Sequence, residues 1–179
     1  PMFDVDAAAA GTGKTLLCDT MAIIATGRRL PRSPYVADDN EMRKRILAHV
    51  LAGDGAALID NVPNGARVGW PSLDAALTSG AIRDRILGLS ELREAPHRMV
   101  WFVTGNNVCL VSDVARRTLR ICLAADTACP EERTGFAIQP LLPYVYQRRG
   151  ELLGAALTIL RAYILAGSPK QSTVQIGSF

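Results

Sequence analysis

A short glycine-rich stretch, GTGKT at residues 11–15, constrains the fold of this chain more than any other part of its sequence. Gly11 and Gly13 let backbone N–H groups turn inward around an anion, where side chains would collide. Lys14 would then lie against β- and γ-phosphates, and the hydroxyl of Thr15 would be a ligand of Mg²⁺. The apolar run that follows predicts a helix, whose N-terminus adds its dipole to the anion site. The stretch therefore predicts a loop that binds the phosphates of a nucleotide.

The full pattern of such a loop, G-x-x-x-x-G-K-[ST], begins with one more glycine, and this chain has Ala8 in that place. Alanine is the smallest replacement, and Ala8 lies outside the part of the loop that surrounds the phosphates, so we expect the loop to bind nucleotide. The alternative is a glycine-rich turn before an ordinary helix, which the strand-like segment 2–5 before the loop disfavours. The expected phosphate-binding residues are Ala10, Gly11, Thr12, Gly13, Lys14, Thr15 and Leu16.

Apolar runs alternate with segments of helical periodicity, which is typical of a parallel sheet covered by helices on both faces. The predicted fold class is therefore α/β. Strands are expected at 2–6, 33–37, 56–60, 98–104 and 119–124. Helices are expected at 14–25, 40–51 with Asp39 or Asn40 as cap, 72–78 with Ser72 as cap, 113–117, and 141–166 with a break near Gly150. Residues 82–87 are expected to be helical or a turn.

An acidic residue closes the apolar run AALID at 56–60. At the tip of a buried strand, Asp60 would accept the water shell of Mg²⁺ opposite Thr15. An aspartate that merely ends a strand is the alternative, and the phosphate loop upstream disfavours it. The next residue, Asn61, can orient a water molecule but cannot take its proton. Hydrolysis is then either slow or uses another acid as base, for which Glu41 is the candidate; a first-turn acid favoured by the helix dipole is the alternative for Glu41.

Two further polar groups accompany core strands. VWFVTGNN at 100–107 presents Asn106 at a strand tip, where its amide would hold the γ-phosphate or the attacking water, although T-G-N-N by itself is only a good turn. Arg116 and Arg117 precede the last expected strand. Arginine keeps its charge and is suited to stabilising a γ-phosphate. In a ring of subunits, it can also reach the γ-phosphate bound by the neighbouring subunit. We favour Arg117, with Arg116 close behind, over a solvated basic turn.

The amino-acid composition limits the possible classes of protein but does not indicate a function. The hydrophobic fraction of 49% allows a sizeable core, and the net charge of +3 is compatible with nucleic acid without arguing for it. The four cysteines have no C-x-x-C spacing, so no zinc site is expected, and they favour the reducing cytoplasm. The longest apolar stretch, 152–166, contains Arg161 and is too short to span a bilayer, so no membrane contact is expected. Because hardly any strand precedes the loop, we expect the chain to be part of a longer protein.

In their order, the motifs resemble those of AAA+ ATPases. GTGKT is similar to the Walker A loop, ALIDN to Walker B, TGNN to sensor 1, and ARRTLR to the arginine-finger segment; CPEER before a helical tail resembles the start of the lid. The resemblance implies a P-loop NTPase sheet between helices, ATP with Mg²⁺, a nucleotide-binding core over 1–128 and an incomplete helical lid over 129–179. Asn61 departs from it, because most such ATPases have a glutamate there that polarises the attacking water.

A closer resemblance is carried by RILG (85–88), the stretch 104–123, PEER and LTILRAYILAG (157–167). These are similar to the ATPase module of primase–helicase-type replication proteins from prophages and integrative elements. The resemblance implies a homo-oligomer, a hexameric ring, that acts on DNA as a helicase. It also implies an insert at 88–98 that touches DNA, with Arg93, His97 and Arg98 as candidates, Lys44, Arg45 and Trp70 as weaker ones, and a solvated face as the alternative. The lid arginine that senses the γ-phosphate would be Arg148, Arg149 or Arg161, among which the sequence does not choose.

Three functions follow from these patterns. The leading one is ATP hydrolysis coupled to movement of nucleic acid. The second is a nucleotide switch or scaffold, in which Asn61 makes the site bind ATP without turning it over. The third is a small-molecule phosphotransferase built on the same loop, which would need an acceptor pocket and mobile lids that carry arginine.

Overall fold

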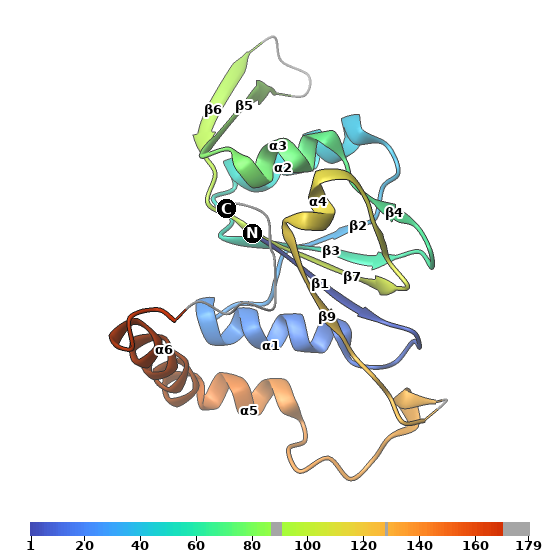
Figure 1. Ribbon diagram of the computed structural model, residues 1–179, viewed down its shortest axis with the longest axis vertical. Helices are drawn as coiled ribbons and strands as arrows, with labels where there is room; N and C mark the ends of the chain where they lie inside the picture. The colour runs from blue at the N-terminus through green and yellow to red at the C-terminus, as the bar shows by residue number, and fades with distance from the viewer. Residues whose placement is uncertain (87–90, 128, 170–179) are drawn as a thin grey trace.

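The computed structural model describes residues 1–86, 91–127 and 129–169, and within them a five-stranded parallel sheet forms the centre of the molecule (Figure 1). The strand order is β2-β3-β7-β1-β9. The strands are β1 (Met2–Ala7), β2 (Arg32–Pro34), β3 (Ala56–Val62), β7 (Val100–Asn106) and β9 (Thr118–Cys122). The α/β class and the parallel sheet predicted from the alternating pattern are thus confirmed.

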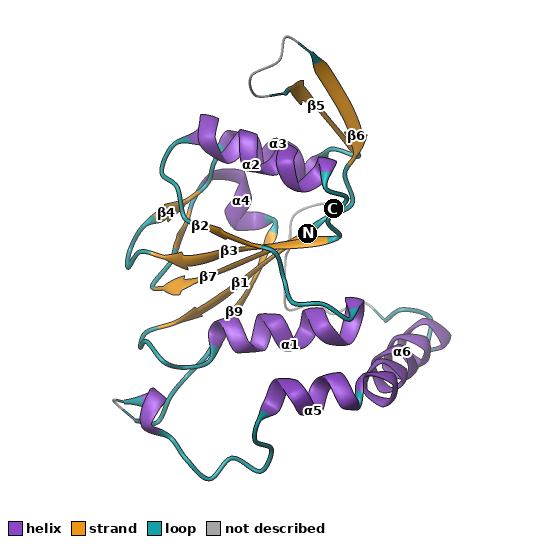
Figure 2. Cartoon of the chain, turned by 180° about the vertical axis from the view of Figure 1, so that it is seen from behind, coloured by secondary structure: helices purple, strands orange, loops and turns teal. Residues whose placement is uncertain are grey.

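Helices cover both faces of the sheet (Figure 2). On one side lies α1 (Lys14–Thr26), which contacts α5 (Leu141–Gln147) and α6 (Arg149–Leu165); on the other lie α2 (Asp39–Leu51), α3 (Pro71–Thr78) and α4 (Ser112–Arg116). Successive strand side chains point to opposite faces, so Leu58 and Phe102 pack with the α1 side, while Ile59 and Trp101 belong to the core of the other side. This double burial explains why the strands are continuous apolar runs.

Glycines set both ends of α1. Gly13 precedes the helix at φ 85°, and Gly27 follows it at φ 80° and donates its N–H to the carbonyl of Ile23 at 2.8 Å. Both conformations are left-handed and favour glycine. The helix therefore begins directly after the last glycine of the GTGKT loop, so its first N–H groups face the space in front of the loop.

The caps of α2 and α3 differ from the expected ones. Asp38, not Asp39 or Asn40, caps α2, and its carboxylate accepts the backbone N–H of Glu41 at 3.1 Å. Asp39 accepts the backbone N–H of Ser72 at 3.0 Å and its hydroxyl at 2.7 Å, which joins α2 to α3. The α3 helix begins one residue before Ser72, which binds Asp39 rather than capping its own helix.

An antiparallel hairpin of β5 (Ala81–Arg85) and β6 (Leu92–Pro96) projects from the α2 and α3 side (Figure 1). The prediction of a helix or turn from residue 82 was therefore wrong, and the exposure of the residues along 81–85 alternates one by one, as it does in a strand. The insert expected at 88–98 supplies only the second strand, and residues 87–90 lie outside the described part of the chain. Arg43 of α2 forms an ion pair with Asp84 at 3.3 Å, which ties the hairpin to the core.

Short elements complete the structure. Strands β4 (Arg67–Val68) and β8 (Cys109–Leu110) pair in parallel, and a 3-10 turn, η1, spans Pro130–Glu132. The break predicted in the last helical segment lies at Arg148, between α5 and α6. No helix in the ranges described here is long and apolar enough to cross a membrane.

His97 belongs to the core and not to a nucleic-acid surface. The residue is 6% exposed, its Nε2 accepts from Trp101 Nε1 at 3.4 Å, and its Nδ1 lies 3.4 Å from the carbonyl of Ser79. An imidazole with one accepting and one donating nitrogen is in its neutral form. Burial lowers the pKa of His97, which the hydrogen bond to Ser79 opposes. Trp70, 4% exposed and bonded to the Val36 carbonyl, is equally unavailable to DNA.

We therefore expect acid to destabilise the fold through His97. The unfolded chain binds a proton at the ordinary pKa of about 6.5, whereas the folded pKa is lower. Between the two pKa values the unfolded state holds more protons, so stability is retained above about pH 6.5 and falls as the pH drops below it. Urea unfolding at pH 7.5 and 5.5 should show a larger loss for the native chain than for His97→Gln, whose amide can still accept from Trp101. Equal losses would contradict this assignment.

Candidate functional site

The GTGKT loop needs glycine at residue 11 for two reasons. Gly11 has φ 71°, in the left-handed region. A side chain there would also meet η1, since a Cβ at Gly11 would lie 2.8 Å from the Cβ of Glu131 and 3.0 Å from its backbone nitrogen. At Gly13, φ is 85° and a Cβ would meet no atom within 4 Å. Both glycines of this loop thus have left-handed conformations, and η1 packs against Gly11.

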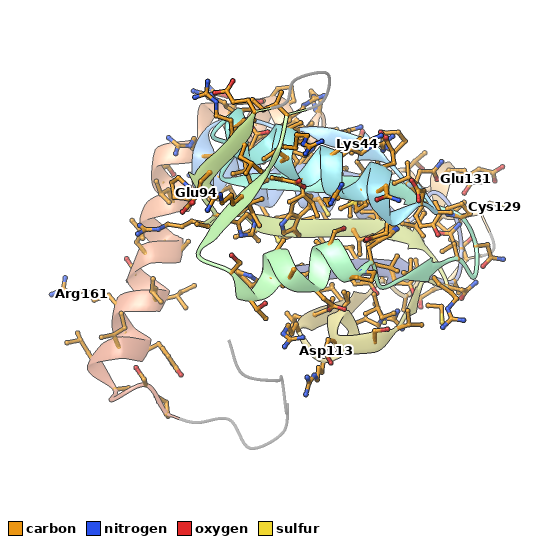
Figure 3. The ribbon with its side chains drawn as sticks, turned by 90° about the horizontal axis from the view of Figure 1, so that it is seen from above. Lys44, Glu94, Asp113, Cys129, Glu131 and Arg161 are labelled. Carbon is orange, nitrogen blue, oxygen red and sulfur yellow. The ribbon has the colours of Figure 1, made fainter. Side chains whose placement is uncertain are left out.

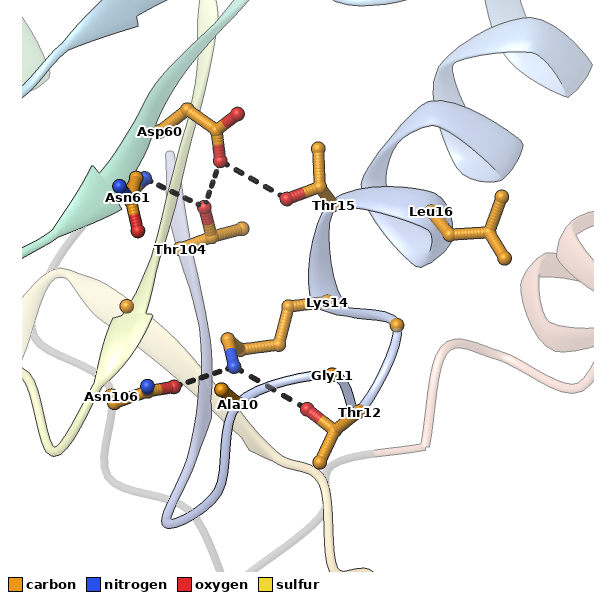
Figure 4. Close-up of a pocket in the computed structure, with 12 residues that line it drawn as sticks. Ala10, Gly11, Thr12, Lys14, Thr15, Leu16, Asp60, Asn61, Thr104 and Asn106 are labelled. Carbon is orange, nitrogen blue, oxygen red and sulfur yellow. Dashed lines mark hydrogen bonds between the residues drawn. The ribbon is translucent and has the colours of Figure 1, made fainter. Parts of the chain in front are cut away.

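A pocket of about 270 Å³ opens between this loop and the tips of β3 and β7 (Figure 4). Because β7 lies between β1 and β3 in the sheet, a side chain at its tip lies between the loop after β1 and the end of β3. The pocket is lined by Ala10, Gly11, Thr12, Gly13, Lys14, Thr15, Leu16, Asp60, Asn61, Thr104, Gly105 and Asn106. All seven residues expected for the loop therefore share one cavity with Asp60, Asn61 and Asn106.

Lys14 reaches across the pocket from the start of α1 (Figure 4). Its Nζ donates to Asn106 Oδ1 at 2.6 Å, to the carbonyl of Ala9 at 3.2 Å and to Thr12 Oγ1 at 3.3 Å. Burial lowers the pKa of Lys14, and the carboxylate of Asp6 opposes this shift. The ammonium group is thus held by neutral oxygen acceptors, which leaves its charge available to an anion in the pocket.

Asp60, at the end of β3, is held by two hydroxyl groups. Its Oδ1 accepts from Thr15 Oγ1 at 3.0 Å and from Thr104 Oγ1 at 2.6 Å. A hydroxyl beside one carboxylate is a donor set that fits Mg²⁺, which binds through one or two carboxylates together with substrate phosphates. The residues present would therefore suit Mg²⁺, with Thr15 and Asp60 as the side chains that would hold it.

Asn61 has an unusual backbone conformation. Its φ is 58°, and the pairing of β3 with β7 shifts register between Ile59 and Val62. Its backbone N–H donates to Thr104 Oγ1 at 3.3 Å. Asparagine tolerates the left-handed region better than most residues with a side chain. The bulge turns Asn61 into the pocket, and it gives a structural reason for asparagine at a position where glutamate would be strained.

Glu41 lies outside the pocket. Its carboxylate pairs with Arg45 at 3.3 Å and Lys44 at 3.5 Å, all on α2, and it stands in the first turn of that helix. These contacts fit the alternative of a first-turn acid rather than a catalytic base. Among the described residues that line the pocket, Asp60 is the only carboxylate, so the cavity offers an attacking water no second acid.

The two candidate finger arginines differ in exposure. The side chain of Arg117 is 13% exposed, with Nη1 at 2.9 Å from Asp113 and 3.9 Å from Asp74. The side chain of Arg116 is 61% exposed and lies 2.8 Å from Asp113, which Figure 3 labels at the surface of the molecule. Neither lines the pocket of its own chain. The preference for Arg117 finds no support in this geometry, because the exposed member of the pair is Arg116.

None of the three lid arginines lines the pocket. Arg149 donates to the carbonyls of Ile23 at 3.0 Å and Ala25 at 3.2 Å, so it caps the C-terminal end of α1, far along that helix from the loop. Arg148 pairs with Glu151, and Arg161 points away from the rest of the molecule (Figure 3). In this arrangement Arg149, at the start of α6, attaches α6 to the C-terminal end of α1.

The structure adds Thr104, which the sequence analysis did not single out as a site residue. It is 1% exposed and joins Asp60 to the backbone of Asn61. A hydroxyl at the end of an otherwise apolar strand was the available signal. Comparison with known proteins finds no matching family model and no matching curated protein. The function must therefore be argued from the pocket itself.

Proposed function

We propose that this chain is an ATP-binding and ATP-hydrolysing module of the AAA+ type, working as a subunit of an oligomeric motor on DNA. The observation that carries the proposal is one pocket in which Lys14 contacts Asn106 and Thr15 contacts Asp60. A cation, a metal-ligand pair and an amide, arranged around a glycine loop at a helix N-terminus, are the groups that a nucleoside triphosphate requires.

In this proposal each group has a separate task. The loop N–H groups and Lys14 bind the β- and γ-phosphates, and Thr15 and Asp60 hold Mg²⁺, which would neutralise charge that develops on the phosphates. Asn106 would leave Lys14 and orient the γ-phosphate or the water. The finger from a neighbouring subunit is assigned to Arg116, because its exposure lets it reach another chain.

A second candidate, a switch that binds ATP with little turnover, is supported by the lack of a second carboxylate among the described pocket residues. Asn61 can hold a water but cannot accept its proton. In this case the nucleotide would set the state of an assembly rather than drive movement. The two candidates share the binding site and differ in the rate of hydrolysis.

DNA dependence tests the motor part of the proposal. Arg83, Arg85 and Arg93 are exposed on the β5–β6 hairpin and offer charges for phosphate contacts. We expect single-stranded DNA to raise the ATPase rate of the protein that contains this chain, and we expect Arg83→Ala with Arg93→Ala to remove most of that increase. Arg161→Ala, an exposed arginine on α6, is the matched control and should retain it. An ATPase rate that ignores DNA would exclude the motor but leave the nucleotide site.

A further inference from the structure

Asp60 also has a charged neighbour, Arg32, which the proposed function does not use. The Oδ1 atom of Asp60 is taken by Thr15 and Thr104, whereas Oδ2 lies 3.6 Å from Arg32 Nη1. Arg32 begins β2, the neighbour of β3, and its other terminal nitrogen, Nη2, lies 2.6 Å from Asp19 Oδ2. One guanidinium therefore bridges two carboxylates from different elements, α1 and β3.

Asp19 is placed where a bridge to the metal site is possible. It follows Thr15 by four residues on α1, so both side chains lie on the same face of the helix. Asp19 is 2% exposed, and its Oδ1 is buried without a hydrogen-bond partner. A carboxylate so deeply buried needs a cation, and Arg32 is the closest one. Asp19 therefore fixes Arg32, which in turn faces the free oxygen of Asp60.

We propose that Arg32, held by Asp19, is a positioning residue that orients the metal-binding carboxylate of Asp60 toward Thr15. This inference rests on the proposed binding of a metal–nucleotide complex, and it adds residues that the motif pattern does not contain. The planar fork of arginine suits the task, because one plane presents donors to both carboxylates, whereas the single ammonium of lysine does not. The expected ligand of the oriented carboxylate is Mg²⁺ bound to the phosphates of a nucleotide.

The coupling between Mg²⁺ and nucleotide binding measures this role without relying on turnover. The affinity for a fluorescent ATP analogue would be determined in excess Mg²⁺ and in EDTA, and the ratio of the two Kd values is the metal-dependent gain. Outer partners of metal ligands typically contribute about 10- to 100-fold to metal affinity. We expect Arg32→Gln to reduce the metal-dependent gain by about that factor and to leave the Kd in EDTA nearly unchanged.

Two controls separate orientation from folding. Arg29 is also near Asp19, at 3.9 Å, but no ion pair joins it to Asp60 in the described residues, so Arg29→Gln should keep the full metal-dependent gain. The double variant Asp19→Asn with Arg32→Gln leaves no unpaired buried carboxylate at Asp19 and should fold even where Arg32→Gln does not. The double variant should still lose the metal-dependent gain. The single variant Arg32→Lys should keep only part of that gain.

The possible outcomes distinguish different roles for Arg32. An unchanged metal-dependent gain in the folded double variant would overturn the inference and leave Asp19–Arg32 as a purely structural pair. A larger gain would also overturn it, because Arg32 would then oppose the metal by repulsion. If the native chain binds no nucleotide in either condition, the proposed function fails first. Equal loss in Arg29→Gln and Arg32→Gln would show a general charge effect rather than positioning.

Discussion

Replacing Lys14 by alanine should lower ATP turnover by about 100-fold or more, the usual cost of removing one charge-stabilising donor from such a site. The structure gives the reason, since Lys14 Nζ is the cation that projects into the pocket and is held by neutral oxygens of Asn106, Ala9 and Thr12. No carboxylate of the described residues forms an ion pair with Lys14, so its charge can be compensated by phosphate. The same substitution should also weaken nucleotide binding, because the phosphates lose their main positive contact.

Thermal unfolding makes the binding part of this prediction independent of turnover. A ligand that binds only the folded state raises stability with its concentration relative to Kd. ATP should therefore raise the Tm of the native chain but hardly that of Lys14→Ala, while the two proteins should unfold similarly without nucleotide. Lys44→Ala is the matched control, because Lys44 is exposed on α2 and, among the residues that the structure describes, pairs with Glu41 alone. Equal stabilisation of all three proteins by ATP would exclude the loop as the binding site.

The local part of the site was accessible from the sequence. Glycines at fixed spacing determine the loop, and apolar runs locate the strands whose tips carry Asp60 and Asn106. In a parallel sheet the carboxyl ends of the strands lie at one edge, so the approach of Asp60 and Asn106 to Lys14 follows from strand polarity and order. These are short-range patterns combined with one rule of topology.

Contacts between distant elements were not accessible. The half-buried Arg117 pairs with Asp74 of α3 as well as with the neighbouring Asp113, and the sequence separates Arg117 from Asp74 by more than one element. The resemblance placed His97 and Trp70 among the candidates for DNA contact, but both lie in the core. Trp70 donates to the carbonyl of Val36, and the two ring nitrogens of His97 contact Trp101 and the carbonyl of Ser79. The bridge from Asp19 through Arg32 to Asp60 likewise joins three elements. Side-chain burial depends on tertiary packing, which residue type alone does not specify.

Asn61 is the residue that distinguishes ATP hydrolysis from ATP binding without turnover. We expect Asn61→Asp to raise turnover by about tenfold or more, because a general base typically contributes about 10²- to 10⁴-fold and aspartate is shorter than the usual glutamate. Aspartate also tolerates the left-handed φ of 58° at this position. Asn61→Glu should gain less despite its longer reach, because a left-handed conformation costs such a residue about 1–2 kcal/mol and strains the N–H contact with Thr104.

Single-turnover hydrolysis of bound ATP, compared across Asn61→Asp, Asn61→Glu and Asn61→Gly, measures this directly. Asn61→Gly is the matched control, since glycine accepts the backbone conformation without a side chain and should keep nucleotide affinity while turnover falls. A native rate that is slow but measurable, together with a gain in Asn61→Asp, supports a weak motor; a native rate at background with the same gain supports the switch. If Asn61→Asp instead falls to the level of Asn61→Gly, proton transfer does not limit the reaction, and the amide of Asn61 is itself the group that orients the attacking water.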